Sequence, residues 1–214
     1  MAATFPLPLA ALSDLLPVNS VEFNLEHRQE ISGTGSGLIL AADVSDPLWM
    51  PSVECVRLRN SASLAIESAI DLLDGSIGTF LLANPRRPHP AADPTGSILG
   101  SNTVTILANQ NGKEIKLQGL PSGYVLTPGD HVAWDFGSVR VFHRIVTGAT
   151  ADGAGETGWM ELRPHLIPTS AAVDTEVILK KPAMVARIVP GTLSGRRRNG
   201  QFVDGISFQA VQVL

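Results

Sequence analysis

The sequence predicts a mainly β protein with one flanking α-helix. Twenty glycines and fifteen prolines in 214 residues imply many turns between short elements. Several runs alternate apolar and polar residues, as strands with one wet face do, whereas only residues 60–75 keep the spacing of a helix. Because a single amphipathic helix among many strands usually closes the open side of a sheet, we expect that arrangement here.

The predicted helix is signalled along its length and at both ends. Its sequence is NSASLAIESAIDLLDG, in which Ile66, Ile70 and Leu73 fall on one face. Asn60 or Ser61 suits the N-cap, and Gly75 suits the left-handed position that follows a helix. The apolar face needs a partner, and we expect it to lie across a sheet.

The first part of the chain has the pattern of strands joined by turns. Residues 20–31 alternate apolar and polar side chains. The glycine-rich loop at residues 32–37 is followed by neither a lysine nor a helix, so it lacks the features of a phosphate-binding loop. Trp49 is expected to pack as an anchor in a proline-bounded connection at residues 46–52. The other strands predicted in this part are residues 38–44, 53–59 and 78–84.

The later part of the chain begins after a proline-rich stretch at residues 85–96, which suits neither a helix nor a central strand. Turn signals such as Asn111-Gly112 and Asp152-Gly153 then separate short strands, as in a small barrel or sandwich. These strands are predicted at residues 103–107, 114–118, 132–136, 139–146, 158–163 and 176–180. Two last strands are predicted at residues 184–189 and 205–214, with a bulge near Ala210 because the apolar residues there break alternation.

The two ends of the chain are expected to form one domain. The first part alone supplies a thin sheet, and the last two strands have no obvious place in a compact barrel. The sequence therefore predicts a domain of residues 1–96 with 182–214 and an inserted β domain of residues 97–181. Residues 85–96 and 181–182 would be the two passages between them.

Charge and composition exclude several classes of protein. The net charge is −4 and the pI about 5.7, which gives no electrostatic reason to expect sequence-specific nucleic-acid binding. The single cysteine, Cys55, cannot form an internal disulfide. Residues 1–17 are apolar but contain Pro6 and Pro8 and lack a basic start, so we interpret them as an arm rather than an export signal. No stretch is long and apolar enough for membrane insertion.

No residue pattern indicates catalysis. Five histidines occur without a second ligand at a metal-site spacing. They are His27, His89, His131, His143 and His165. Among the carboxylates Asp130, Asp135, Glu156 and Glu161, two at the right separation would suffice for a glycosidase, but turn carboxylates are usually solvated. We therefore expect no enzyme activity, no cofactor and no metal.

Arg196, Arg197 and Arg198 form the strongest charge run, within the glycine-flanked segment GTLSGRRRNG. Such a run is most often a solvated loop. It could also contact an acidic partner protein or grip phosphate, because guanidinium groups bind both carboxylates and phosphates. Of these two, we favour the protein contact.

A family resemblance rests on the middle of the chain. Residues 117–130, LQGLPSGYVLTPGD, are followed by VFHRIV at 141–146, by ATADGAG at 149–155 and by MELRPHLIP at 160–168. With the helix and GTFLLANPRRPHP at 78–90, this arrangement resembles tail proteins of long-tailed, siphovirus-like bacteriophages and prophages. The likeness spans residues 53–189 and indicates the distal tail protein or a relative at the tail tip.

The resemblance implies both a fold and a function. The fold would be a tail-tube-like β-sandwich or barrel with a flanking helix, plus a small peripheral β-barrel or β-sandwich domain. The function would be that of a structural virion protein, made in the host cytoplasm, which forms a hexameric ring between the tail tube and the tail hub or baseplate. Its partners would be copies of itself, the tail tube protein and the hub protein, with the tape measure protein as a further candidate. The ring would leave a channel for DNA.

Subunits of such a ring meet heterologously, and a sixfold rotation closes the contact. We expect the first sheet and the helix to form the ring, with residues 1–17 and the arginine segment touching neighbouring subunits. The expected interface residues are Ile66, Ile70, Leu73, Arg196, Arg197 and Arg198. The alternative function is a carbohydrate-binding module, in which the inserted domain attaches the tail tip to glycans on the host surface.

Overall fold

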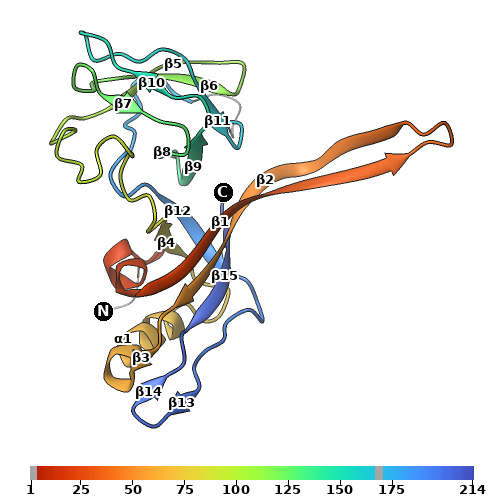
Figure 1. Ribbon diagram of the computed structural model, residues 1–214, viewed down its shortest axis with the longest axis vertical. Coiled ribbons are helices and arrows are strands. Elements are labelled where there is room, and N and C mark those ends of the chain that lie inside the picture. Colours follow the sequence, from red (N-terminus) through yellow and green to blue (C-terminus); the bar gives the residue numbers. More distant parts are fainter. Residues whose placement is uncertain (1–3, 167–170) are drawn as a thin grey trace.

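A computed structural model describes residues 4–166 and 171–214, and it confirms a mainly β protein with one α-helix among the described residues (Figure 1). The first sheet is entirely antiparallel and has the order β1-β2-β15-β12-β4. Its strands are β1 (Val18–Gly33), β2 (Ile39–Cys55), β15 (Ser207–Gln212), β12 (Ala183–Ile188) and β4 (Phe80–Ala83). Strands from the two ends of the sequence therefore pair in one sheet.

A second sheet of order β5-β6-β11-β9-β8 lies above the first in Figure 1. Its strands are β5 (Thr105–Gln110), β6 (Glu114–Gln118), β11 (Met160–Arg163), β9 (Val139–Ile145) and β8 (His131–Phe136). Two-residue strands, β7 (Val125–Leu126) and β10 (Ala149–Thr150), pair beside it. The strand predicted at residues 176–180 is wrong, because this segment forms only isolated bridges to Thr105 and Ala133.

The helix α1 (Asn60–Asp71) forms where its apolar spacing predicts. Neither Asn60 nor Ser61 is its N-cap: the cap is Arg59, which makes no side-chain cap hydrogen bond. Asn60 instead binds a neighbouring turn, with its Nδ2 donating to the carbonyl of Gly200. Gly75 has a φ of 71°, in the left-handed region, but the helix ends at Asp71 with Leu72 as its C-cap, so Gly75 lies in the turns beyond the cap and not directly after the helix.

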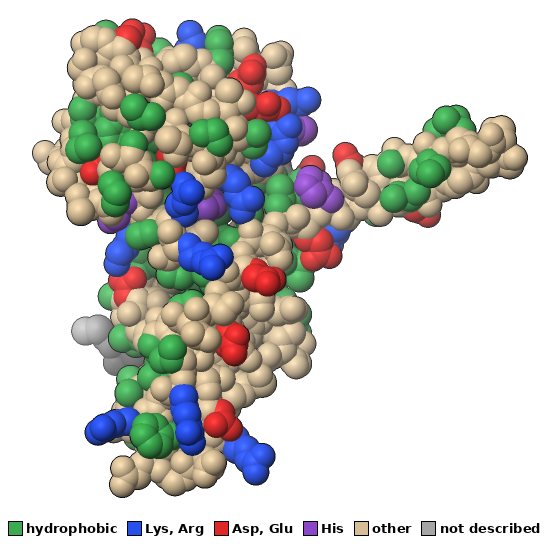
Figure 2. Space-filling view, viewed as in Figure 1, with side chains coloured by type: hydrophobic (Ala, Val, Ile, Leu, Met, Phe, Trp, Pro, Cys, Tyr) green, Lys and Arg blue, Asp and Glu red, His purple; other side chains and the backbone are tan. Residues whose placement is uncertain are grey.

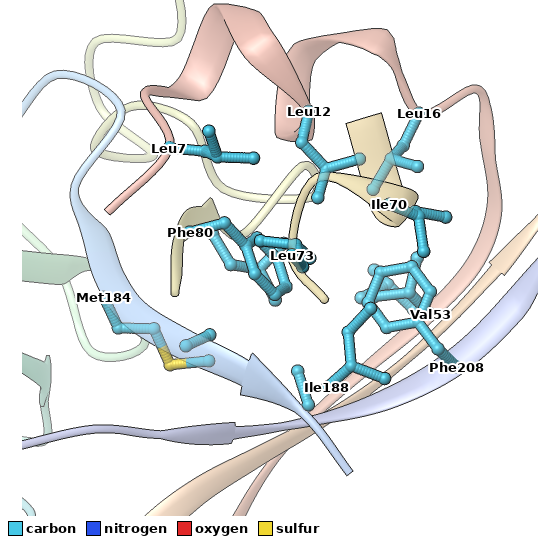
Figure 3. Close-up of a cluster of buried hydrophobic side chains, with 14 of the residues drawn as sticks. Leu7, Leu12, Leu16, Val53, Ile70, Leu73, Phe80, Met184, Ile188 and Phe208 are labelled. Atoms are coloured by element: carbon cyan, nitrogen blue, oxygen red, sulfur yellow. The ribbon is translucent and has the colours of Figure 1, made fainter. Parts of the chain in front are cut away.

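The first core lies between α1 and the first sheet (Figure 3). Phe80, Leu82, Val53 and Phe208 of the sheet are almost fully buried there. The N-terminal segment, with the 3-10 turns η1 (Leu9–Ala11) and η2 (Ser13–Leu15), covers the same core. Its buried side chains are Leu7, Leu12 and Leu16.

Two expectations about individual strands are wrong. Residues 46–52 are not a connection, because β2 runs without a break from Ile39 to Cys55. Its register with β1 shifts between Glu26 and Gln29, which places extra residues in β2 near Pro47. The bulge expected near Ala210 is absent as well: β15 buries Phe208, Ala210 and Gln212 in strict alternation, and its register contains no shift.

A second core gathers the buried hydrophobic residues between Leu99 and Leu179. Ala133 and Phe142 are exceptions, since they lie in the second sheet but pack into the first core. The division into domains of residues 1–96 with 182–214 and 97–181 remains our proposal. Ala133 and Phe142 lie where the two proposed domains meet.

Residues 85–96 contain no helix or strand and are held by buried carboxylates. Asp130 accepts hydrogen bonds from the Nη1 of Arg87 and the N–H of Ala91, at 3.1 and 2.9 Å. Asp93 accepts from the N–H of Leu99 at 2.9 Å. The passage between the two proposed domains is therefore held at the residue before β8 and at Leu99.

Candidate subunit interface

The hairpin of β1 and β2 extends well beyond the body of the protein (Figure 1). Every residue from 26 to 46 is exposed. The distal ribbon, defined here as these residues, carries large apolar side chains that are 53–70% exposed. They are Ile31, Leu38, Ile39, Leu40 and Val44. Exposed apolar side chains gathered in this way mark an interaction surface.

The strand register places these side chains on both faces of the ribbon. Ile31 pairs with Ala41, and Ile39 pairs with Gly33, which puts Ile31 and Ile39 on one face. Leu40 pairs with Ser32 and therefore points to the other face. A two-stranded ribbon is marginally stable in water unless something covers a face. Both faces of the distal ribbon are thus available to a neighbour.

The tip of the distal ribbon is a well-formed turn. The N–H of Thr34 donates to the carbonyl of Leu38 at 2.8 Å, and the N–H of Leu38 donates to the Oγ1 of Thr34 at 3.2 Å. Gly37 has a φ of 82°, which few other residues adopt. Along the ribbon, the amide of Gln29 donates to Asp43 at 2.8 Å. These contacts define one register for the exposed strands.

The base of the hairpin is clamped by the second sheet. Arg144 donates from its Nη2 to the carbonyl of Phe23 at 2.8 Å, and its guanidinium lies 4.6 Å from the ring centre of Trp49. The fully buried Trp49 confirms the predicted anchor. Because β1 and β2 are held at this point, the direction in which the hairpin leaves the body is fixed.

The edge of the first sheet at β1 is open, since no described strand pairs with it on that side. The face of this sheet opposite the first core carries three glutamates, together with Met50, Val211 and the exposed Arg187. Glu22 and Glu26 alternate along β1 with the buried residues Val21 and Phe23, and Glu54 lies opposite Ser20 on the same face. The surface is visible beside the hairpin in Figure 2, where acidic side chains gather.

The three helix residues expected at the interface are part of the protein's own core. Ile66 and Ile70 are 3% exposed and Leu73 is fully buried. An amphipathic face predicts burial but does not say whether the covering surface belongs to the same chain. Here it does, so these side chains have no surface to offer a second subunit, and this part of the expectation is wrong.

Two of the three arginines at residues 196–198 contact the helix, and the third is exposed to solvent. Arg196 forms an ion pair with Asp71 of α1 at 2.9 Å, and Arg198 approaches Glu67 at 3.7 Å. Arg197 is exposed, and no ion pair of its side chain occurs among the described residues. The segment is thus docked on the helix, and only Arg197 keeps the outward role expected of all three.

The N-terminal arm packs on its own chain as far as it is described; residues 1–3 of the predicted arm lie outside the described residues. The N–H of Leu7 donates to the carbonyl of Thr79 at 2.8 Å, and the N–H of Leu81 donates to the carbonyl of Leu7 at 2.9 Å. Asp14 accepts from Lys181 at 3.2 Å. The described part of the arm therefore extends the first core instead of reaching away from the body.

The carboxylates considered for catalysis have separate structural roles. Asp135 binds Arg140 at 2.7 Å, and hydrogen bonding to this arginine lowers the pKa of Asp135. Glu161 binds Arg163 at 2.7 Å, which likewise lowers its pKa. Asp130 is fully buried under Arg87, and Glu156 is exposed. Neither Asp135 nor Glu161 has the raised pKa that a general acid needs.

The histidines do not gather at one place with other ligands. Among residues 4–166 and 171–214, no cluster of three or more His, Cys, Asp or Glu side chains is arranged to hold a metal ion. His143 is buried, and one of its ring nitrogens, Nδ1, lies 2.9 Å from the carbonyl of Pro164. His131 is buried with no hydrogen-bond partner on either ring nitrogen. His131 lies near the contact between the two sheets, where its ring packs on Trp49 and Phe142, whereas His143 stacks on Trp134 of the second sheet.

Sequence reasoning missed the most prominent feature, the length of the hairpin. A usable signal was present, because the strands predicted at residues 20–31 and 38–44 flank a short glycine loop. A scan of the sequence against protein-family models finds no match, and neither does a search of curated proteins. No described helix has the length and apolar character needed to cross a membrane.

Proposed function

We propose that this protein is a structural component of a phage tail, which forms a ring of six copies between the tail tube and the tail hub or baseplate. The observation that carries the proposal is the distal ribbon. It exposes Ile31 and Ile39 on one face and Leu40 on the other, beyond the reach of the protein's own core. A surface of this kind is stable in water when a neighbouring subunit covers it.

The geometry favours a heterologous contact. The ribbon leaves one side of the body, whereas the open edge and faces that can receive it belong to the body itself (Figure 1). A protrusion on one copy then meets a receiving surface on the next, and a rotation that closes the series gives a ring. Copies of one chain are therefore the partners that this shape supports best.

The glutamate-bearing face of the first sheet suits a wall of the DNA channel. Glu22, Glu26 and Glu54 present carboxylates there, with Ser20 and Asn24 between them. Carboxylates repel the phosphates of DNA, whereas a basic wall would hold them by releasing counterions. Such a face would let DNA slide through without binding.

The mass of the protein in solution and its arrangement in the particle test this function. Light scattering after gel filtration should give six times the chain mass of 22.6 kDa, and electron microscopy should show a sixfold ring. Because ring proteins can stay monomeric until a neighbour templates them, the measurement is repeated with the tail tube protein present. A protein that stays monomeric in both settings and in the particle would overturn the proposal, and glycan binding by that monomer would favour the carbohydrate-binding alternative.

The variant I31D/I39D supplies the matching mutational test. Charges on the apolar face of the ribbon should prevent assembly, because a subunit contact would bury them without partners. The control is S32D/S45D, which adds the same charge to the ribbon at two exposed serines. Loss of the ring in the first variant and its retention in the second is the expected result.

A further inference from the structure

A small sheet at the end of the molecule opposite the second sheet has an outward face rich in arginine. It consists of β3 (Leu58–Arg59), β14 (Phe202–Val203) and β13 (Arg198–Asn199), in the order β13-β14-β3. Val203 is fully buried and pairs with Leu58, so this side of the sheet faces the core. Phe202 pairs with Arg59 and Asn199, and these three residues point outward.

Three exposed arginines belong to this face: Arg57 and Arg59 contact or pair with Phe202, and Arg197 precedes β13. The guanidinium of Arg57 lies 5.0 Å from the centre of the ring, which is the geometry of a cation–π contact. Arg59 and Arg197 are exposed like Arg57, and none of the three forms an ion pair within the described part of the chain. Figure 2 shows Lys or Arg side chains together with a hydrophobic one at this end of the molecule.

The face is rigidly attached to the body. The ion pairs of Arg196 with Asp71 and of Arg198 with Glu67 hold the arginine segment against α1. The N–H of Asn60 donates to the carbonyl of Gln201 at 3.0 Å, which ties the turn between β13 and β14 to the start of the helix. The first turn of α1 contains no acidic residue, so the partial positive charge of the helix start is not offset there. The concentration of positive charge is thus built into the fold of a chain whose net charge is −4.

We infer that the outward face formed by Arg57, Arg59, Arg197 and Phe202 is a docking site for an acidic segment of a partner protein. Arginine and aromatic residues supply most of the binding energy at protein interfaces, and guanidinium groups bind carboxylates in pairs of hydrogen bonds. An acidic protein segment fits this face better than nucleic acid does. The face offers three arginines on a chain whose net charge is −4, whereas nucleic-acid binding normally needs an extended basic surface along the phosphate backbone.

The site is independent of the proposed ring, since it lies at a different end of the molecule from the distal ribbon. Binding to it can therefore be measured on the full chain whether or not the chain assembles. A fluorescein-labelled peptide of eight glutamates is the probe, with a labelled strand of eight thymidines and a labelled Gly/Ser peptide as comparisons. Fluorescence anisotropy gives the Kd for each.

The wild-type protein should bind the glutamate peptide, and the variant R57Q/R59Q/R197Q should raise the Kd by about tenfold or more. The control R28Q/R86Q/R187Q removes the same charge from exposed arginines elsewhere and should leave the Kd within about twofold. The variant R57K/R59K/R197K keeps the charge and should give an intermediate Kd, because lysine lacks the paired donors of arginine. Thermal melting of each variant reports whether it is folded.

Three results would overturn the inference. The first is no measurable binding of the glutamate peptide. The second is the same loss of affinity in the test and control variants, which would show only a response to net charge. The third is tighter binding of the thymidine strand than of the peptide at equal ionic strength, which would assign the face to nucleic acid.

Discussion

The indole Nε1–H of Trp49 donates a hydrogen bond of 3.0 Å to the backbone carbonyl of Phe142. The rings of the same two residues meet edge to face, with centres 5.6 Å apart. Trp49 lies in β2 at the base of the long hairpin, and Phe142 lies in β9 of the second sheet. This residue pair therefore joins the hairpin to a segment far along the sequence, together with the contact of Arg144 with Phe23.

Replacing Trp49 with phenylalanine should destabilise the protein by about 2–3 kcal/mol. The change removes the donor to a buried carbonyl and part of a fully buried side chain. Urea unfolding measures the loss in free energy. The control is Trp159→Phe, since Trp159 is only partly buried and its contact is with Lys116 at the surface. Equal losses in the two variants would contradict a special role for Trp49.

His131 predicts a dependence of stability on pH. Its ring is stacked on Phe142, with centres 5.0 Å apart, and both ring nitrogens lack partners. Burial, with the charges of Arg144 and Arg87, lowers its pKa to about 3. In the unfolded chain the histidine has a pKa of about 6.5, so between these values only the unfolded state binds the proton. Stability should therefore fall as the pH drops from about 6.5 towards 3, by about 1.4 kcal/mol per pH unit for this group.

The variant His131→Phe tests this origin of the pH dependence. Phenylalanine keeps the stacked ring and removes the titrating group, so the fall in stability on acidification should be less steep than in the wild type. Urea midpoints at pH 7 and pH 5 provide the measurement. His143 has a pKa lowered by burial to about 4, so the variant should keep the part of the fall that comes from this second histidine. Parallel curves for wild type and variant would rule out His131 as a source.

Asp130 and Asp135 should respond differently to the same substitution. Asp130 is buried and accepts hydrogen bonds from Thr127, Ala91 and Arg87, so Asp130→Asn should cost about 2–4 kcal/mol. Asp135 forms a single exposed ion pair with Arg140, and Asp135→Asn should cost about 1 kcal/mol or less. Thermal denaturation compares the two.

Proteolysis of the passage at residues 85–96 provides a second test of the role of Asp130. Because Asp130 holds residues 85–96 through Arg87 and Ala91, trypsin should cut after Arg86 faster in Asp130→Asn than in the wild type. Asp135→Asn should leave the rate of cleavage unchanged. Cleavage at the wild-type rate in the Asp130 variant would show that the carboxylate does not restrain the linker.

The sequence predicts those parts of the fold whose signals are local. The apolar spacing predicts the helix correctly, although the helix ends at Asp71, before the glycine at position 75. The strand predicted at residues 38–44 stops short of the end of β2 because Pro47 and Pro51 normally interrupt strands. In the structure Pro47 lies at a register shift, and Pro51 lies next to the residues of β2 that pair with β15, which cover only Ser52 to Glu54. At both positions, therefore, the backbone N–H that proline lacks is not needed for pairing with a neighbouring strand.

The candidate interface was harder to predict for a different physical reason. An apolar face shows that a residue is covered but not by which chain, so Ile66, Ile70 and Leu73 were assigned to a neighbour although they belong to the first core. A polar residue can be buried as well: Gln212 takes an inward position in β15, and its Oε1 lies 3.4 Å from the N of Trp49. The apolar residues around Ala210 predict a break in the alternation, but in the structure the alternation continues to Gln212.

Removal of the distal ribbon should separate assembly from folding. Arg28 and Ser45 are opposite each other in the hairpin, so replacing residues 29–44 with Asn-Gly closes it by a two-residue turn. All of the deleted side chains are exposed and none belongs to a core, so the free energy of unfolding should change by about 0.5 kcal/mol or less. Ring formation should be lost, because the apolar surface that a neighbour covers is gone. Light scattering and urea unfolding on the same sample measure both effects. A shortened protein that still assembles would place the subunit contact elsewhere, and one that unfolds far more easily would show that the ribbon supports the body.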